Sequence, residues 1–175
     1  MVIRKINQEF IWEVLINPDK WEANGLDPTK GICLMGIPGV GKTHFMELNA
    51  ERNSKICWGH PKMPRELGLM DCRAQTIKTA CERQGIVFLQ QFQDHELYLD
   101  DLGSESQGTT NHFGTQIDPI TELIQIRYSV RKTNKTNITT NCNLEKIEEI
   151  YGERFADRIP ELCNILILDG KSFRR

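Results

Sequence analysis

Short apolar runs alternate along the chain with stretches in which apolar residues recur at helical spacing. The apolar runs predict strands over residues 31–35, 96–99 and 164–168, and a β-branched stretch with a polar end predicts another over residues 137–141. The periodic stretches predict helices over residues 44–52, 74–84, 119–130 and 144–151. The first run, Gly-Ile-Cys-Leu-Met, has the composition of a buried parallel strand, and the helix predicted after it completes a strand–loop–helix unit.

Other stretches carry weaker signals. Residues 9–16 predict one short helix, and residues 54–64 predict a short strand or a loop. Residues 66–71 are a further strand candidate, whereas the apolar stretch over residues 86–92 fits a strand or a helix equally well. Residues 104–114 are polar and contain glycine, which predicts a mobile loop.

The loop after the first strand is Gly36-Ile37-Pro38-Gly39-Val40-Gly41-Lys42-Thr43, which fits the phosphate-binding pattern G-x-x-x-x-G-K-[ST]. Its glycines let the backbone N–H groups point at phosphate oxygens, and the next helix adds its positive dipole. Lys42 is expected to reach the β- and γ-phosphates, and the Thr43 hydroxyl to bind Mg²⁺. Residues 36–43, with His44 beside them, are therefore predicted to bind ATP and Mg²⁺, and a Gly-rich turn without a ligand is the alternative.

A second chemical signal is the acidic pair Asp100-Asp101, which follows the apolar stretch over residues 96–99. This is the Walker B arrangement, in which Asp100 would support Mg²⁺ and Asp101 would polarise an attacking water. Any exposed strand end can carry two aspartates. The position of this pair after a phosphate-binding loop favours the catalytic interpretation.

Three more polar residues stand out further along the chain. Asn141 ends a predicted strand, and beside the P-loop strand its amide would be within reach of the γ-phosphate or the attacking water. Arg154 and Arg158 are four residues apart, so in a helix they would share one face.

Basic residues also cluster at the end of the helix predicted over residues 119–130, namely Arg127, Arg131, Lys132 and Lys135. Cations at a helix C-terminus favour the helix dipole, and this interpretation is preferred. The alternative is a local patch that contacts nucleic acid. Of the tryptophans, Trp12 or Trp21 could lie near a nucleotide base, but packing against the core is the preferred expectation.

The totals set limits on the fold and the environment. A chain of 175 residues with 39% hydrophobic residues can bury one sizeable core, and one domain is expected. The net charge of −2 excludes a basic field over the whole molecule. Six cysteines without a C-x-x-C pair fit no standard zinc site, and no long apolar segment occurs. A cytoplasmic protein without a membrane contact is expected.

Five segments occur together in this chain: the P-loop, Asp-Asp-Leu-Gly-Ser-Glu, Ile-Thr-Thr-Asn, Tyr-Gly-Glu-Arg-Phe-Ala-Asp-Arg and Gly-Lys-Ser-Phe-Arg. In this order they resemble the AAA+ ATPases of the DnaC/IstB type, which include bacterial helicase loaders and transposition helpers. The resemblance implies an α/β P-loop NTPase fold of AAA+ type, with a central five-stranded parallel sheet flanked by helices and no separate C-terminal lid domain. Residues 31–175 would form this core, and residues 1–30 a short N-terminal segment.

The resemblance also implies roles for single residues. By position, Asn141 corresponds to the sensor 1 residue, and Arg154 and Arg158 fall in the segment that supplies the arginine finger. Arg158 is favoured as the finger, and Arg154 remains the alternative. The alternative for both arginines is a surface ion pair with acidic neighbours on the same helix, without a catalytic role. Arg174 matches a terminal arginine with a role in nucleotide sensing.

An arginine finger completes the site of a neighbouring subunit, so the family implies a homo-oligomer with ATP at its interfaces. The implied function is ATP hydrolysis in DNA replication or transposition, in which the protein loads or remodels a partner. That partner would be a replicative helicase or a transposase, and single-stranded DNA would be a further ligand.

The resemblance departs from the family at the front of the chain. Helicase loaders of this family usually carry an additional N-terminal domain that grips the helicase, and here residues 1–30 precede the P-loop strand. Two alternatives stay open: a small P-loop kinase and an ATP-binding module without a DNA role. A kinase of this class usually has an arginine-rich lid, and the sequence shows none.

Overall fold

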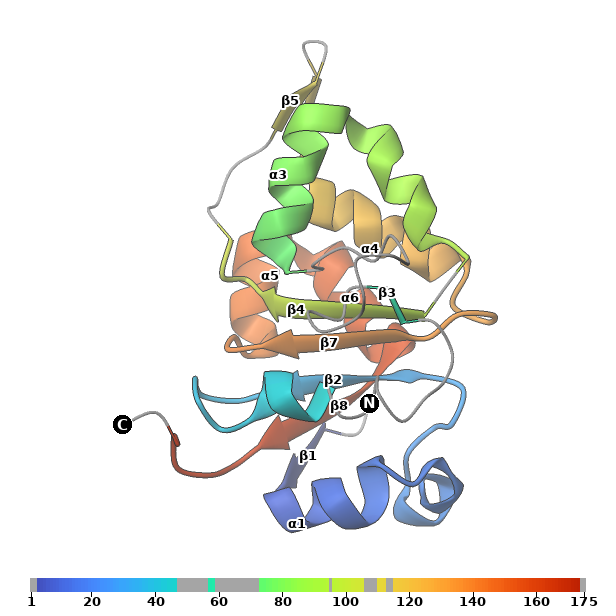
Figure 1. The fold of residues 1–175 in the computed structure, drawn as a ribbon, viewed down its shortest axis with the longest axis vertical. Helices are drawn as coiled ribbons and strands as arrows, with labels where there is room; N and C mark the ends of the chain where they lie inside the picture. Colours follow the sequence, from blue (N-terminus) through green and yellow to red (C-terminus); the bar gives the residue numbers. More distant parts are fainter. Residues whose placement is uncertain are drawn as a thin grey trace.

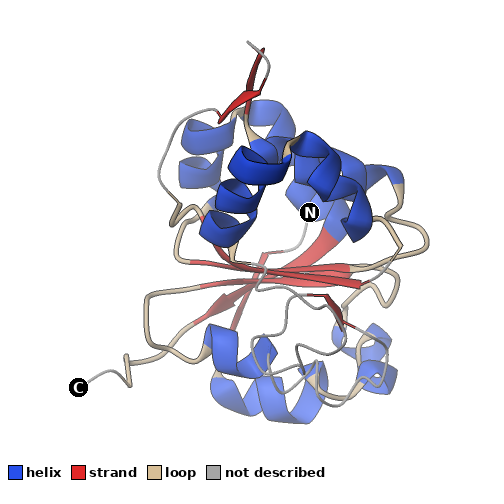
Figure 2. Ribbon diagram, turned by 45° about the horizontal axis from the view of Figure 1, so that its top comes forward, coloured by secondary structure: helices blue, strands red, loops and turns tan. Residues whose placement is uncertain are grey.

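The computed structural model describes residues 3–46, 57–58, 73–94, 96–105, 110–112 and 115–173. Within these residues a sheet of parallel strands is covered by helices on both faces (Figures 1 and 2). Its strands are β1 (Ile3–Ile6), β2 (Gly31–Met35), β3 (Cys57–Trp58), β4 (Glu96–Leu102), β7 (Thr136–Thr140) and β8 (Cys163–Leu168). They lie in the order β1-β8-β2-β7-β4-β3.

The α/β fold with a parallel five-stranded sheet is confirmed in strands β8, β2, β7, β4 and β3. Strand β1 adds a sixth strand at the edge, where Ile3 pairs with Ile165 and Ile6 with Leu168 of β8. Part of the N-terminal segment therefore belongs to the sheet. No separate lid domain is present among the residues that the structure describes.

One face of the sheet carries most of the helices (Figure 2). These are α3 (Ala74–Gln84), the 3₁₀-helix Ile86–Phe92, α4 (Pro119–Ser129), α5 (Leu144–Tyr151) and α6 (Glu153–Leu162). Alternate residues of the strands, such as Cys33, Leu97 and Ile138, point into the core beneath them. The predicted helices over residues 74–84 and 144–151 are confirmed at both ends, and α4 ends one residue before the predicted bound.

The other face is covered by the N-terminal segment and by the helix that begins at residue 42. The N-terminal segment comprises α1 (Gln8–Phe10), the π-helical turn Ile11–Leu15 and the 3₁₀ turns Pro18–Lys20 and Glu22–Asn24. Trp21 is buried here and donates its indole N–H to the Leu15 carbonyl at 3.1 Å, whereas Trp12 is exposed. Core packing is thus the correct account of Trp21.

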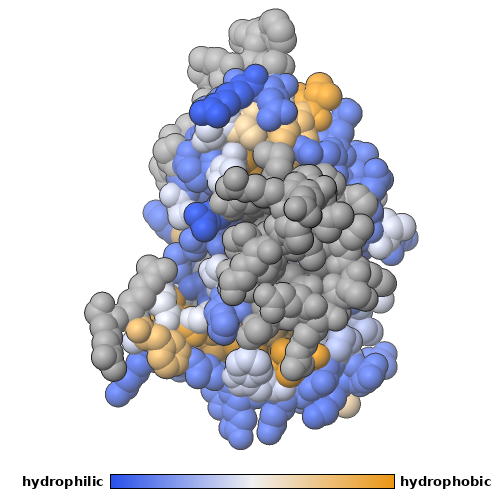
Figure 3. All heavy atoms as spheres, viewed as in Figure 1, coloured by the Kyte–Doolittle hydropathy of each residue, from blue (hydrophilic) through white to orange (hydrophobic). Residues whose placement is uncertain are grey.

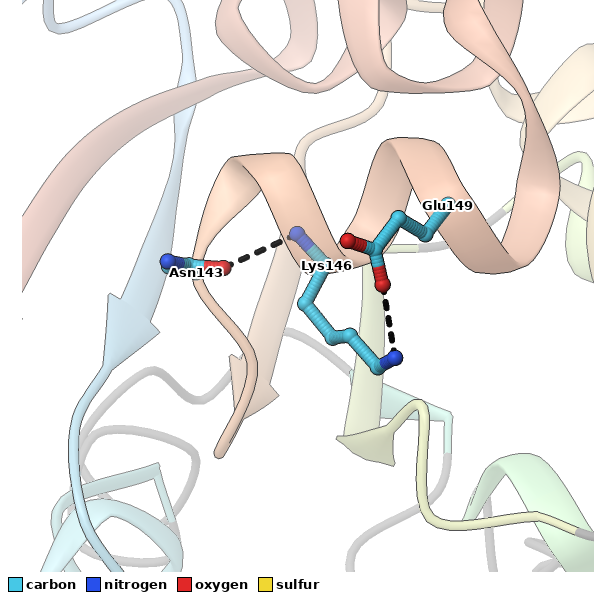
Figure 4. A network of polar contacts seen from close by, with 3 residues as sticks. All are labelled: Asn143, Lys146 and Glu149. Carbon is cyan, nitrogen blue, oxygen red and sulfur yellow. Dashed lines mark hydrogen bonds and ion pairs between the residues drawn. The ribbon is translucent and has the colours of Figure 1, made fainter.

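Local sequence signals set the bounds of the helices near the site. The Asp118 carboxylate caps α4 by accepting the N–H groups of Ile120 and Thr121, and Pro119 takes the first position of the helix. Asn143 caps α5 by accepting the N–H of Lys146 at 2.9 Å (Figure 4). Gly152, with φ of +88°, separates α5 from α6.

The weak sequence signals have mixed outcomes. The ambiguous stretch over residues 86–92 is a 3₁₀-helix, and only Cys57–Trp58 is a described strand within residues 54–64. The loop predicted over residues 104–114 is partly wrong, because β5 (Thr110–His112) pairs with β6 (Thr115–Ile117) in an antiparallel hairpin. The strand candidate over residues 66–71 lies outside the described residues.

Exposed large apolar side chains include Ile3, Trp12, Ile37, Val87 and Phe173. On the face shown in Figure 3, hydrophilic residues predominate and apolar residues occupy separate areas between them. None of the described helices is long and apolar enough to cross a membrane.

Candidate nucleotide-binding site

The P-loop leaves the carboxyl end of β2 at the centre of the sheet. Gly36 has φ of +156°, Gly39 of +85° and Gly41 of +100°, and only glycine adopts these values readily. A Cβ on Gly36 would lie 2.6 Å from the Leu168 carbonyl oxygen, so the loop passes close to β8. A helix then begins at residue 42, with the Phe45 N–H donating to the Gly41 carbonyl at 2.9 Å. The predicted curled loop and helix N-terminus are both present.

Lys42 lies folded against this loop and is 5% exposed. Its Nζ donates to the carbonyls of Gly36 at 2.7 Å and Ile37 at 3.0 Å, and to Asn141 Oδ1 at 2.7 Å. The ammonium group is thus held where the loop, β2 and β7 meet. Its acceptors are neutral oxygens, which an anionic phosphate oxygen can replace with a stronger charge-assisted bond.

Thr43 and Asp100 form the second part of the site. Thr43 Oγ1 donates to Asp100 Oδ1 at 3.0 Å, and the Thr139 hydroxyl donates to the same carboxylate oxygen. Burial raises the pKa of Asp100, and the charge of Asp101 raises it further, while the bonds from Thr139 and Thr43 lower it. A half-buried carboxylate beside a hydroxyl offers the hard oxygen ligands that Mg²⁺ prefers.

Asp101 has an unusual backbone for a residue in a strand. Its φ is +54°, and the register between β4 and β7 shifts between Leu99 and Leu102, as in a β-bulge. The Asp101 N–H donates to Thr139 Oγ1 at 3.0 Å, and its carbonyl accepts the N–H and hydroxyl of Ser104 at 3.0 and 2.6 Å. A strained conformation that is held from both sides is typical of functional sites.

Asn141 follows β7, the strand between β2 and β4. Its side chain is exposed apart from the bond to Lys42. The α5 cap at Asn143 comes two residues later and fixes the direction in which the chain leaves β7. The structure therefore brings Lys42 and Asn141 into one hydrogen-bonded pair and Thr43 and Asp100 into another at the same edge of the sheet, with Asp101 next to Asp100 in the chain.

Arg154 and Arg158 lie on α6 and take no part in the hydrogen bonds of Lys42 and Asp100. Arg154 is exposed, whereas Arg158 is half-buried and donates to Gln125 Oε1 of α4 at 3.2 Å. The Arg158 guanidinium also lies 5.2 Å from the centroid of the Tyr128 ring. Both arginines line an open cleft of about 320 Å³ between α4 and α6. The structure does not connect either arginine with the P-loop of its own chain.

Two predicted nucleotide contacts have different outcomes in the structure. His44 is exposed in the first turn of the helix after the P-loop. Arg174 lies outside the described residues. The preceding segment does reach the P-loop, because the Phe173 N–H donates to the Gly39 carbonyl at 3.0 Å.

Arg127 corrects one expectation. The basic cluster predicted at residues 127–135 is not a common surface, because Arg127 is fully buried. Its guanidinium donates to Thr136 Oγ1 at 2.9 Å and to the carbonyls of Phe92, Asn134 and Lys135. Arg127 thus binds backbone at the amino ends of β7 and β4 and does not belong to a surface cluster.

Sequence reasoning missed Thr139, Ser104 and Glu105 as parts of the site. Thr139 could have been found from the strand order, because β7 lies beside β4 and Leu99 pairs with Ile138, which places Thr139 next to Asp100. Ser104 and Glu105 act on the turn after Asp101. Nothing in the spacing of the sequence signals that turn.

Comparison with solved structures supports the fold. The structure resembles the crystal structure of the DnaC helicase loader, with a TM-score of 0.52 and 23% sequence identity. The match covers 93% of this chain and 85% of that chain. No model of a protein family matches the sequence, and no curated protein matches it. The expected resemblance to DnaC-type proteins is therefore confirmed for the fold.

Proposed function

We propose that this protein is a Mg²⁺-dependent ATPase of AAA+ type. The proposal is supported by two hydrogen-bonded pairs at the carboxyl edge of the sheet, Lys42 with Asn141 and Thr43 with Asp100. Ligands of α/β proteins bind at this edge, and phosphates bind at the N-terminus of the helix there. The positive-φ glycines leave the loop backbone open to phosphate oxygens.

In this proposal each residue of the candidate site has one task. Lys42 exchanges its carbonyl acceptors for the β- and γ-phosphates, and Thr43 with Asp100 holds the metal. Bound Mg²⁺ supplies positive charge that neutralises the phosphate oxygens. Asp101 polarises the attacking water, and Asn141 orients it within reach of Lys42.

The proposal assigns the arginines of α6 to a neighbouring subunit. Arg158 contacts α4 and lines an open cleft, so its guanidinium is held at a surface and not at the P-loop of the same chain. A positive charge from outside the subunit would stabilise the developing charge on the transferred phosphoryl group. The protein would then work as a homo-oligomer. Arg158 is the preferred finger because it is held by two contacts, and Arg154 is the alternative.

The fold of the DnaC helicase loader suggests the biological setting. We infer that ATP binding and hydrolysis control the loading or remodelling of a partner, either a replicative helicase or a transposase, in DNA replication or transposition. Single-stranded DNA would be a second ligand and would raise the rate of turnover.

The experiment is ATP turnover by the purified protein, with and without single-stranded DNA, for wild type, Lys42→Ala and Asp101→Asn. Asp101→Asn should lose hydrolysis by about 10²-fold or more and still bind ATP, whereas Lys42→Ala should lose both. Glu149→Gln on exposed α5 is the matched carboxylate-to-amide control and should keep the wild-type rate. Full turnover by Asp101→Asn would contradict the proposed mechanism, and no effect of DNA would contradict the proposed setting.

A further inference from the structure

Glu105 is a buried carboxylate that the proposed mechanism does not use. It is 9% exposed and lies four residues after Asp101 in the chain. Its Oε2 accepts the Gly103 N–H at 3.0 Å, and its Oε1 accepts the hydroxyl of Tyr151. One carboxylate thus joins the turn that ends β4 to the last residue of α5.

The turn that Glu105 holds sets the direction of Asp101. Gly103 has φ of +86°, and a Cβ there would lie 2.8 Å from Cys142 Sγ, so the turn is packed against the chain that follows Asn141. Asp101 itself has a positive φ, which most side chains avoid. A turn with two such residues needs contacts that over-determine it. The bond from Gly103 to Glu105 is one of them.

Tyr151 carries the connection to the helix with the arginines. Its ring stacks on Phe155 of α6 with centroids 4.3 Å apart and planes inclined by 20°. Phe155 is buried, and it follows Arg154 directly in the chain. The hydroxyl of Tyr151 therefore contacts Glu105, which bonds the turn after the acidic pair, and its ring contacts α6.

The surroundings of Glu105 come from several elements. Burial raises the pKa of the Glu105 carboxyl, and the bonds from backbone N–H groups lower it. The charge of Asp118, at the cap of α4, raises this pKa further, and the charge of Lys78 on α3 lowers it. Glu105 thus lies where α3, α4 and α5 approach the end of β4.

We propose that Glu105 is a positioning residue. By bonding both Gly103 and Tyr151 it fixes the turn after Asp101, and this turn fixes the position of the acidic pair relative to α6. The inference rests on the proposed ATPase activity only for its effect on turnover. If the bond from Glu105 to Gly103 or to Tyr151 is lost, the turn loses one of the contacts that fix it, while the P-loop, Lys42 and Thr43 stay in place. The rate of hydrolysis falls, and ATP binding does not.

The test compares Glu105→Ala, Tyr151→Phe and Glu105→Gln by kcat and by ATP affinity. We expect the first two to lower kcat about tenfold, since a small misplacement of a catalytic group has effects of this order, with ATP affinity unchanged. Glutamine can accept from Gly103 and donate to the Tyr151 oxygen, so Glu105→Gln should recover most of the rate. The double variant Glu105→Ala/Tyr151→Phe should be no slower than Glu105→Ala alone, because both changes break one link.

Two results would overturn the inference: an unchanged kcat in Tyr151→Phe, or a loss of ATP affinity as large as the loss of kcat. Glu149→Gln, on the exposed side of α5, is the control and should behave as wild type. Hydrogen exchange at the Gly103 amide separates this inference from the ATPase proposal. If wild type does not hydrolyse ATP, faster exchange in Tyr151→Phe still supports the link, and unchanged exchange refutes it.

Discussion

The two ends of the parallel sheet use similar polar residues in different ways. At the amino ends, Arg127, Asn137 and Asn164 are bonded mainly to backbone groups. Asn137, for example, accepts the Ile32 N–H at 3.0 Å and donates to Glu96 Oε1 at 2.8 Å. At the carboxyl ends, Asp100 is bonded to the side chains of Thr43 and Thr139. Lys42 is bonded to the side chain of Asn141 and to the carbonyls of the P-loop.

The kind of hydrogen-bond partner distinguishes structural from functional polar residues. A buried cation whose partners are fixed carbonyls holds the strands together, and its loss leaves those carbonyls without a donor. A cation at the strand exits, with a side-chain partner beside an open loop, can exchange partners when a ligand binds. The free energy of unfolding of variants at the amino and carboxyl ends of the strands tests this distinction.

The largest effect is expected at the amino end. Arg127→Met should lower the free energy of unfolding by about 3–5 kcal/mol, because it removes the donor of a buried carbonyl at Phe92 and of partly buried carbonyls at Asn134 and Lys135. Urea unfolding followed by circular dichroism measures this change. A loss below about 1 kcal/mol would show that Arg127 contributes little to the sheet.

A smaller loss is expected for Asn137→Ala, at about 2–3 kcal/mol, since the Ile32 N–H loses its acceptor in the core. Asn141→Ala is the matched change at the other end of the same strand. It should cost no more than about 0.5 kcal/mol in stability, because the side chain is exposed. Equal losses in the two variants would abolish the contrast between the ends.

Lys42→Met should change stability by no more than about 1 kcal/mol, even though the residue is as cationic as Arg127. The Gly36 and Ile37 carbonyls that it leaves lie in a loop at the surface, where water can replace the ammonium group. ATP binding, measured by titration calorimetry, should be lost. Normal ATP affinity in a stable Lys42→Met protein would contradict the assignment of the loop.

The pKa of Asp100 predicts a pH dependence of smaller size. Because burial raises this pKa in the folded protein, the folded state binds the proton more tightly than the unfolded state. The contribution of Asp100 to stability therefore falls as the pH rises from the ordinary carboxyl range through the raised pKa. Asp100→Asn should remove this part of the pH dependence, and an identical profile in wild type and variant would contradict the assignment.

The smallest effect is expected on exposed α5. Lys146 Nζ lies 2.7 Å from Glu149 Oε2, and both side chains are more than half exposed (Figure 4). Lys146→Ala should change the free energy of unfolding by no more than about 0.5 kcal/mol, since solvent and salt screen such pairs. If Lys146→Ala loses more than about 1 kcal/mol in urea unfolding, exposure does not distinguish polar residues that stabilise the fold from those that do not.

The sequence predicted the central strands and the helices α3, α4 and α5 because their apolar spacing and end signals agree. The N-terminal strand β1 escaped prediction because Ile3–Ile6 is too short and polar to show a period, and it becomes a strand only by pairing with β8. Sequence analysis also placed Arg127 in a surface cluster. Its guanidinium is bonded to acceptors in two separate segments, at Phe92 and at residues 134–136, which no local pattern reveals.

The candidate site was predictable where the chemistry is local. The P-loop and the Asp100-Asp101 pair each lie in one short segment, and the structure places Thr43 beside Asp100. The roles proposed for Arg154 and Arg158 would depend on a second subunit, so neither spacing nor a single chain can test them. Thr139 and Glu105 act through neighbours that are distant in sequence, and they became visible only in the fold.

The most direct test of the shared-site proposal is ATP turnover by mixed subunits. Lys42→Ala and Arg158→Ala should each be inactive alone. An equal mixture should recover about one quarter of the wild-type rate, since half of the subunits keep Lys42 and half of their neighbours keep Arg158. Arg154→Ala on the same helix distinguishes the two candidate fingers, and it should stay active if Arg158 is the finger. Full activity of Arg158→Ala alone, or no recovery in the mixture, would contradict a site completed by Arg158 of a neighbouring subunit.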